Sequence, residues 1–527
     1  MSRHLITATL IVIVVLSHPG CAARILGVFP FPSLSHQIVF RGLTLALRER
    51  GHELVVVTPN PINDRTLKNY TEIDVSFLYQ HLSLDWITLA KKYTWYEFVM
   101  KSTPIHSAMT EGILSHPELQ KLYEPESGES FDLLLCETLR WPALLLLAKR
   151  FNIPTIGITS LYPPHQLHYQ LGNPIMPSHP PYWNMKGTAV GKLTFWQRLY
   201  NFVATWRYLH HYRTTYTQEQ QEIARKYFGN DVPDLGDLEK NVSLVFVNQQ
   251  APISFARPNV PNIIDIGGFH ISDQRKPLSK DLQRILDEAT QGFIYMSLGS
   301  NAKSASLTNK TRDEFVAAFS KIPYTVIWKF EDDRLPGQPE NVHVMKWIQQ
   351  QSILAHPNLK VFIYQGGLQS TEEAVSHAVP VIGLPVFCDQ ESNVDKIVSL
   401  GVGKKLDIFS VDRFGLMEAI HSIVRDDSYK QNMLKLRDLI KDKPYDTLKN
   451  AVWWTEHVIR HKGAPHLHST TADDPWYQRQ DMDLMFITST AIWIAFSITL
   501  GVLHKLLTYS IYFLNQQHLI RKKEKVY

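Results

Sequence analysis

Short apolar runs alternate with amphipathic stretches along most of this chain, which is the pattern of parallel α/β folds. Residues 25–31 form an apolar run that predicts a first buried strand, and residues 54–58 predict the next strand. Between them, residues 38–50 carry apolar positions at helical spacing, and Gly51 suits the end of that helix. The chain therefore opens with a β-α-β unit.

The alternation continues on both sides of a Pro- and Asn-rich connector at about residues 247–268, which we interpret as a linker between two α/β domains. Residues 162–181 are rich in Pro, His and Tyr and predict a long irregular loop, and residues 201–228 predict a surface-packed helix. We expect an N-terminal domain over residues 24–265 and a C-terminal domain over residues 266–470. The remaining predicted strands are 131–136, 154–159, 293–298, 324–330, 342–345, 360–364 and 379–384, and the remaining helices are 142–150, 312–320 and 370–378.

The N-terminus predicts a secretory signal peptide over residues 1–23. Arg3 and His4 precede an apolar run that is too short to span a bilayer, and Cys21-Ala22-Ala23 offers small residues for cleavage. An uncleaved anchor is the alternative interpretation.

The C-terminus predicts a transmembrane helix over residues 484–503, because about 20 apolar residues cross the hydrocarbon core. The tail, residues 504–527, is basic, and positive charge stays on the cytoplasmic side. This places the domains in the lumen of a single-pass membrane protein. The sequons at Asn69, Asn241 and Asn309 fit that topology. Residues 523–527 resemble a dilysine retrieval signal for the endoplasmic reticulum, or form a plain basic flank.

The composition is that of an ordinary globular protein, with 44% hydrophobic and 20% charged residues. A net charge of +4 over 527 residues gives no reason to expect nucleic-acid binding. The three cysteines, Cys21, Cys136 and Cys388, lie far apart, so neither a disulfide framework nor metal-ligand spacing is visible.

The segment 362–390 carries the clearest candidate chemistry. A strand ends at Tyr364, Gly366-Gly367 turns the chain, and a helix follows. Glycines let backbone amides approach a ligand, and a helix N-terminus presents free N–H groups with partial positive charge. Such a turn can bind a pyrophosphate. By itself it could equally be a structural turn.

This segment, together with Lys346-Trp347-Ile348-Gln349-Gln350, resembles the signature of the UDP-glycosyltransferase superfamily, in particular its membrane-bound animal enzymes. The resemblance covers most of the mature chain. It implies an α/β GT-B fold with two Rossmann-like domains facing a cleft. It also implies transfer of a glucosyl or glucuronosyl group from a UDP-sugar co-substrate to a hydroxyl of a small lipophilic acceptor, with inversion and with no metal or other cofactor.

The resemblance also assigns roles to individual donor-site residues. Trp347 would stack on the uracil, and Glu373 would hold the ribose hydroxyls, whereas its neighbour Glu372 is expected to be a solvated helix residue. The other residues that it places at the UDP-sugar are Gly299, Ser300, Gln350, Gln365, Gly367, Gln369, Ser370, Asp389 and Gln390.

His36 follows the first strand, in the loop where ligands collect in open α/β folds. It matches the family's catalytic histidine, which removes the proton of the acceptor hydroxyl. Glu137, at the end of a later strand, is the preferred partner to orient His36, and Asp132 is the second choice.

The chain departs from the family pattern at Tyr364 and Gln365, where Thr-His is usual. Glutamine can donate a neutral hydrogen bond to a diphosphate but not a charge-assisted one. The alternative function is therefore a catalytically impaired membrane protein that binds a UDP-sugar or a lipophile. The identities of the donor sugar and the acceptor, and the oligomeric state, stay open at this level.

Overall fold

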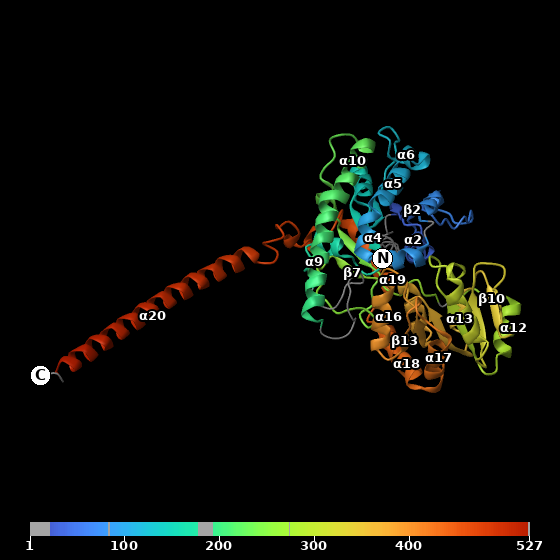
Figure 1. Cartoon of the computed structure of the whole chain (residues 1–527). Coiled ribbons are helices and arrows are strands. Elements are labelled where there is room, and N and C mark those ends of the chain that lie inside the picture. The colour runs from blue at the N-terminus through green and yellow to red at the C-terminus, as the bar shows by residue number, and fades with distance from the viewer. Residues whose placement is uncertain (1–21, 83–84, 178–192, 273–274, 525–527) are drawn as a thin grey trace, which may run out of the picture. The chain divides into compact units, whose positions relative to one another are not determined.

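The computed structural model describes residues 22–82, 85–177, 193–272 and 275–524 (Figure 1). One compact unit ends at Ser469 and a second begins at Thr470. The first unit contains two parallel β-sheets flanked by helices. Of the predicted signal peptide, residues 1–21 lie outside the described residues, and Ala23 is already buried in the core of this unit.

The N-terminal sheet has seven parallel strands in the order β3-β2-β1-β4-β5-β6-β7. Its strands are β1 (Arg24–Val28), β2 (Glu53–Thr58), β3 (Tyr70–Asp74), β4 (Leu133–Glu137), β5 (Thr155–Thr159), β6 (Leu244–Val247) and β7 (Ile263–Asp265). Its helices are α2 (Leu34–Glu49), η1 (Ser76–Leu82), α3 (Trp86–Lys92), α4 (Trp95–Lys101), α5 (Thr103–Leu114), α6 (Pro117–Tyr123), η2 (Pro142–Leu145), α7 (Leu146–Phe151), α8 (His165–Gln170), α9 (Phe195–His211), the π-helix η3 (Tyr212–Tyr216), α10 (Thr217–Phe228) and α11 (Leu235–Lys240).

The C-terminal sheet has six parallel strands in the order β10-β9-β8-β11-β12-β13. Its strands are β8 (Phe293–Ser297), β9 (Thr325–Lys329), β10 (Val342–Met345), β11 (Leu359–Tyr364), β12 (Val381–Gly383) and β13 (Gly403–Lys405). The helices after β7 are α12 (Lys280–Glu288), η4 (Ser304–Ser306), α13 (Asn309–Phe319), α14 (Gln350–Leu354), α15 (Leu368–Ser376), α16 (Gln390–Ser399), α17 (Arg413–Arg425), α18 (Ser428–Lys441) and α19 (Thr447–His461), followed by the short η5 (Pro465–Leu467).

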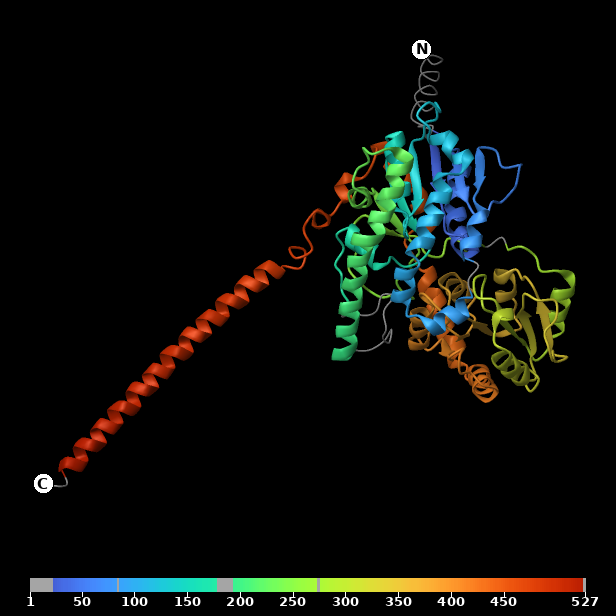
Figure 2. The same ribbon diagram turned by 45° about the horizontal axis from the view of Figure 1, so that its top comes forward.

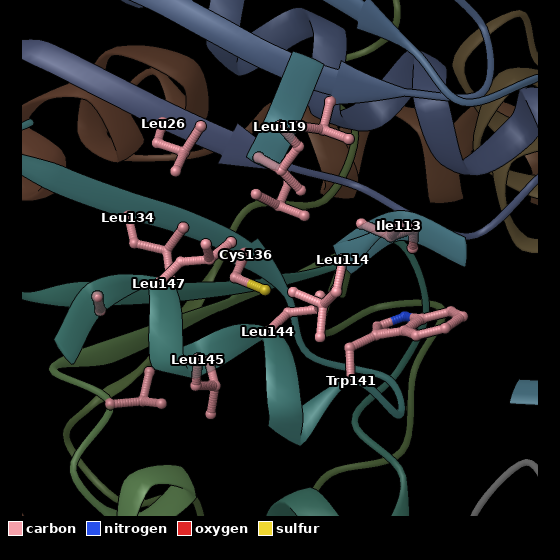
Figure 3. Packing of buried hydrophobic residues seen from close by; sticks show 14 of the residues in the cluster. Leu26, Ile113, Leu114, Leu119, Leu134, Cys136, Trp141, Leu144, Leu145 and Leu147 are labelled. Carbon is pink, nitrogen blue, oxygen red and sulfur yellow. The ribbon is translucent and has the colours of Figure 1, made fainter. Parts of the chain in front are cut away.

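Each sheet is buried on both faces, which explains why its strands read as continuous apolar runs. Along β4 the side chains alternate: Leu134 and Cys136 belong to one core cluster (Figure 3), and Leu133 and Leu135 belong to the cluster on the opposite face. Burial of one such leucine side chain contributes roughly 1.5–3 kcal/mol to stability. These two layers fix the sheet that carries His36 and Glu137.

Both sheets reverse their strand order at one point, and these points coincide with the predicted site. In the N-terminal sheet β1 lies between β2 and β4, and in the C-terminal sheet β8 lies between β9 and β11. Ligands of open α/β sheets bind at the carboxyl ends of the strands at such a point. The predicted GT-B arrangement of two Rossmann-like halves is confirmed.

Three local predictions were wrong in part. Helix α2 begins at Leu34, four residues earlier than predicted, so His36 lies in its first turn rather than in a loop. The predicted irregular loop at 162–181 contains α8, although residues 178–181 lie outside the described residues. The predicted linker at 247–268 contains β7, the edge strand of the N-terminal sheet.

The long predicted helix at 201–228 is confirmed as the run α9, η3 and α10. The run begins earlier, at Phe195, where Thr194 and Gln197 form a capping box. The first turns of α9 expose Phe195 and Trp196 to solvent.

Helix α19 returns from the C-terminal half to the N-terminal sheet. It packs on α2, and Ala451, Val452 and Val458 join the same core cluster as Ile25 and Leu43. The covering layer of the first sheet is thus completed by residues at the end of the unit (Figures 1 and 2).

The second unit contains the turn η6 (Thr470–Ala472) and the helix α20 (Met482–Glu524). Within the described residues, α20 is the helix that is long and apolar enough to cross a membrane. The predicted span 484–503 lies inside it, but the helix does not end there. It continues through most of the predicted tail.

Candidate active site

A cavity of about 480 Å³ lies between the carboxyl ends of the two sheets. Residues of both halves line it, as expected for a ligand site at facing switch points. His36 lines it from the N-terminal half. The predicted donor residues all line it too: Gly299, Ser300, Trp347, Gln350, Gln365, Gly367, Gln369, Ser370, Glu373, Asp389 and Gln390.

His36 and Glu137 are in direct contact. The Nδ1 atom of His36 lies 3.1 Å from Oε1 of Glu137, and both side chains are buried. The other carboxylate oxygen accepts the backbone N–H of Phe31 at 2.9 Å, and the Phe31 ring stacks on His36 with centroids 4.6 Å apart. Because Nδ1 faces the carboxylate, Nε2 is the nitrogen left to accept a proton.

The sheet register explains this contact. Strand β1 pairs with β4, with Val28 opposite Cys136, so Glu137 at the end of β4 lies near the segment that follows β1. Asp132, the second choice, lies at the opposite end of β4, where it accepts the backbone N–H of Arg24 at 2.7 Å. It is therefore not a partner of His36.

Glu373 is the centre of a hydrogen-bonded group on the donor side. Its two oxygens accept Nε2 of Gln350 at 2.7 Å and Nε2 of Gln351 at 3.1 Å. Gln350 also donates to Oγ of Ser370 at 2.8 Å. Burial raises the pKa of Glu373 to about 7. Trp347 lies beside this group with 55% of its surface exposed, so one face of the indole is available to a ligand.

The turn from β11 into α15 needs glycine. Gly366 has φ +91°, and a Cβ there would lie 2.5 Å from Val394 Cγ2 and 2.8 Å from the carbonyl oxygen of Gln390. Gly367 is the N-cap of α15 and contributes no side-chain cap, so the helix start faces the cavity with its backbone. Across from it, Gly299 has φ +85° and leaves room for the amide of Gln365.

Asp389 and Gln390 open α16 on the other side of the same turn. Asp389 accepts Nδ2 of Asn393 at 2.7 Å, and burial raises its pKa to about 6. The side-chain oxygen Oε1 of Gln390 accepts the backbone N–H groups of Val386 and Phe387. The local backbone therefore holds Gln390 in a single orientation at the cavity wall.

Two residues of α15 connect the halves of the unit. Gln369 lines the cavity, but its Nε2 donates to the Ser160 carbonyl of the N-terminal half at 2.7 Å. The expectation that Glu372 is solvated was wrong: it is buried and accepts hydrogen bonds from Asn248 and Gln250. Burial raises its pKa to about 7.

Sequence reasoning missed several polar residues of the cavity wall, among them Lys329 and Asn301. Lys329 donates to the Gly299 carbonyl at 3.0 Å and to Glu331 at 2.7 Å, which fixes the donor loop. Asn301 donates to Oγ of Ser33 at 3.0 Å, across the cleft. Lys329 is the residue before the end of the predicted strand 324–330, and this position near a carboxyl end was the available signal. Asn301 had none.

The N-terminal wall of the cavity is mostly apolar and aromatic. Rings and branched side chains from the β1–α2 loop, α2, α3, α4, α5 and the β4–η2 loop line it. They include Phe31, Leu34, Trp86, Phe98, Ile105 and Trp141.

Known proteins match the chain over almost its whole length. The family model described as UDP-glucoronosyl and UDP-glucosyl transferase matches residues 25–517. A UDP-glycosyltransferase, UGT5, of Dactylopius coccus is 36% identical and covers 90% of this chain and 91% of its own. The ecdysteroid UDP-glucosyltransferase of Spodoptera littoralis nuclear polyhedrosis virus is 32% identical, covering 88% and 93%. The UDP-glucuronosyltransferase 2B1 of Rattus norvegicus is 27% identical, covering 91% and 93%.

Solved structures show the same fold. The glycotransferase of kitacinnamycin has a TM-score of 0.55 at 20% identity and covers 84% of this chain and 99% of its own. Arabidopsis thaliana UGT89C1, solved with UDP-L-rhamnose, has a TM-score of 0.55 at 15% identity and covers 83% and 99%. By the family match and the identity to its relatives, this chain belongs to the UDP-glucuronosyl and UDP-glucosyl transferase family and is a UDP-glycosyltransferase.

Proposed function

We propose that this enzyme transfers a glucosyl or glucuronosyl group from a UDP-sugar to a hydroxyl of a small lipophilic acceptor, with inversion and without a metal ion. The observation that carries the proposal is the contact between His36 and Glu137 at the edge of a cavity whose opposite wall holds the donor residues. A base and a donor cradle in one cavity are what a single displacement needs.

In the proposed reaction, Nε2 of His36 removes the proton of the acceptor hydroxyl as its oxygen attacks the anomeric carbon. The bond from that carbon to the UDP oxygen breaks on the opposite side, which inverts the configuration. The Glu137 carboxylate stabilises the imidazolium that forms and holds the ring in one tautomer. A positioned base contributes about 10²–10⁴-fold to the rate.

The donor residues would hold UDP in the orientation that this attack requires. The exposed face of Trp347 would stack on uracil, and the Glu373 carboxylate would accept the ribose hydroxyls. The diphosphate would meet the N-terminus of α15, where Gly367 leaves the backbone accessible. Negative charge develops on the diphosphate as the sugar leaves, and the helix N-terminus stabilises it.

A lipophilic acceptor is supported by the apolar rings on the N-terminal wall of the cavity. A hexosyl donor is supported by the relatives, which are named as glucosyl- and glucuronosyltransferases. The test is a mass-spectrometric assay of microsomes with UDP-glucose, UDP-glucuronic acid and a mixed panel of phenols and steroids. The proposal is supported if a product appears whose mass exceeds that of the acceptor by one hexosyl group, and if EDTA does not reduce the amount of this product. UDP binding with no product across the panel contradicts it.

That last outcome would favour the second candidate, a UDP-sugar binder with impaired catalysis. Gln365 motivates it, because the amide occupies the position above Gly299 and its buried oxygen has no hydrogen-bond partner among the described residues. The variant Gln365→His distinguishes the two. A gain from no turnover to measurable turnover would show that glutamine impairs the wild-type enzyme.

We also propose that the protein is a single-pass protein of the endoplasmic reticulum membrane with its catalytic unit in the lumen. Helix α20 supports the anchor, and the basic residues after the apolar span 484–503 support the orientation. The sequons at Asn69, Asn241 and Asn309 all lie on exposed positions, where a glycan could be attached.

A further inference from the structure

A buried arginine lines the acceptor side of the cavity, and the roles described above do not use it. Arg140 follows Glu137 by three residues, in the loop between β4 and η2, and only 7% of its surface is exposed. Its Nη1 donates to the Val99 carbonyl at 3.0 Å and to Oγ of Ser102 at 3.1 Å, and its Nη2 donates to Oγ1 of Thr103 at 3.4 Å. All three acceptors are neutral.

This guanidinium has no counter-ion among the described residues. It forms no ion pair there, and its buried Nε has no hydrogen-bond partner. Arginine keeps its proton in proteins, so the site carries a full positive charge. A buried charge without a partner costs several kcal/mol, and native proteins normally pair it.

The groups around Arg140 stabilise the cation but do not neutralise it. Its guanidinium lies 4.2 Å from the centroid of the Tyr216 ring, a cation–π contact. Burial and the charge of Arg140 lower the pKa of His106 to about 3, so that imidazole adds no second charge. Burial raises the pKa of Glu239, which binds the Tyr212 hydroxyl, to about 8, so that carboxyl is mostly neutral at pH 7.

We propose that the missing partner is the acceptor itself, and that the acceptor class is an amphipathic hydroxy acid whose carboxylate is attracted by Arg140. This inference rests on the proposed function and adds the chemical class of the substrate. The apolar rings of the wall hold the body of the acceptor, and the hydroxyl reaches His36. Arg140 is three positions after Glu137, so their Cα atoms are at most about 11 Å apart. An aromatic hydroxy acid spans such a distance.

The test measures binding separately from turnover. The full chain in lipid nanodiscs with UDP is titrated with 6-hydroxy-2-naphthoate and with its uncharged methyl ester, using naphthalene fluorescence. We expect the anion to bind roughly tenfold more tightly than the ester, because a charge-assisted hydrogen bond adds about that much affinity. Arg140→Gln should remove this preference, and Arg140→Lys, which keeps the charge, should retain part of it.

Arg198→Gln is the matched control, because Arg198 is an exposed arginine on α9. It should leave both affinities unchanged. Equal binding of anion and ester to the wild-type protein overturns the inference. So does an equal loss of both affinities in Arg140→Gln, since that is the result of a purely structural role in holding Val99, Ser102 and Thr103.

If Arg140→Gln is too unstable to titrate, the comparison of anion and ester in the wild-type protein and in Arg140→Lys decides. The outcome also separates this inference from the proposed function. If the protein prefers the anion but transfers no sugar from any UDP-sugar, the proposed acceptor class is supported and the proposed reaction is contradicted. If the enzyme transfers sugar to the ester as efficiently as to the acid, the proposed reaction is supported and the proposed acceptor class is contradicted.

Discussion

At the scale of single residues, Glu137 fixes the chemistry of its neighbour by using both of its oxygens. One contacts Nδ1 of His36 and the other accepts the N–H of Phe31, whose ring packs on the same imidazole. The carboxylate cannot turn away without breaking a buried hydrogen bond, which costs about 1–3 kcal/mol. The imidazole is therefore presented to the cavity in one orientation.

His36→Ala should lower kcat by about 10²–10⁴-fold and leave the affinity for UDP almost unchanged, because the base is lost while the donor wall is intact. Single-turnover kinetics and UDP titration measure the two effects. His210→Ala, at an exposed position on α9, is the control and should behave as wild type. Undiminished turnover in His36→Ala would rule out His36 as the base.

Donor binding should weaken as the pH falls. Burial raises the pKa of Glu373 to about 7, so its carboxyl is ionised above that pH and protonated below it. If the ribose hydroxyls need the ionised form, the Kd for UDP-glucose should rise about tenfold from pH 8 to pH 6. The diphosphate of UDP-glucose does not titrate in this range.

Glu373→Gln should bind UDP-glucose weakly at both pH values and lose the pH dependence. Calorimetric titration measures both proteins. An affinity of the wild-type enzyme that is flat between pH 6 and pH 8 would contradict this role for Glu373.

The role of a residue could be predicted where the residue belongs to a motif at the end of a strand. It could not be predicted where the residue is bound by side chains from a distant part of the chain. Trp347, Glu373 and Gly367 were placed at the cavity by their motif, and the structure puts them there. Glu372 was assigned to solvent because its own helix gives no sign of its partners, Asn248 and Gln250, which lie more than 120 residues earlier. The missed Asn301 likewise contacts Ser33 of the other half.

At the scale of elements, the turn between β11 and α15 should tolerate no side chain at Gly366. Gly366→Ala combines a positive φ with a Cβ 2.5 Å from Val394 and 2.8 Å from the backbone of Gln390. We expect a loss of about 2–4 kcal/mol in unfolding free energy and weaker UDP binding, since the strain and the clash add.

Gly128→Ala separates the two contributions. Gly128 also has a positive φ, +69°, but a Cβ there would meet nothing within 4 Å. Its cost should be only the backbone strain, about 1–2 kcal/mol, with UDP binding unchanged. Thermal unfolding of both variants measures the difference between their losses of unfolding free energy. Equal losses would show that movement of α16 relieves the crowding at Gly366.

Helices and strands whose apolar residues follow one clear spacing were predicted well. Those that depend on contacts with distant segments were not. Strand β2, an apolar run of β-branched residues, was predicted within one residue. Strand β7 was hidden in a Pro- and Asn-rich segment because only its pairing with β6 makes it a strand. Helix α2 begins at Leu34, earlier than predicted; Ser33 is its N-cap but forms no side-chain capping hydrogen bond.

At the scale of the whole molecule, the predicted topology gives a measurable glycosylation pattern. With the catalytic unit in the lumen, Asn69, Asn241 and Asn309 are accessible to the glycosylation machinery. Endoglycosidase H should therefore lower the apparent mass of the protein. Each of the three single Asn→Gln variants should lose the part of this decrease that comes from its own glycan. The full chain should also resist carbonate extraction from membranes if α20 is the anchor that we propose. A protein that carries no glycan and is extracted by carbonate would contradict both the orientation and the anchor.

The two-sheet architecture followed from the alternation of apolar runs and amphipathic helices, but the course of the chain after β13 did not. Helix α19 has the same amphipathic pattern as α17 and α18, so its pattern does not indicate which sheet it covers. Only the packing of Ala451 and Val458 against Ile25 and Leu43 assigns it to the first sheet.

That return of α19 sets the order in which a newly made chain can mature. The ribosome delivers all seven strands of the first sheet long before it reaches Ala451, so one flank of that sheet is covered only in part, by α2, while the second half is being synthesised. Nascent chains halted before Thr447 should accordingly be held by chaperones, and release should coincide with the emergence of this last helix.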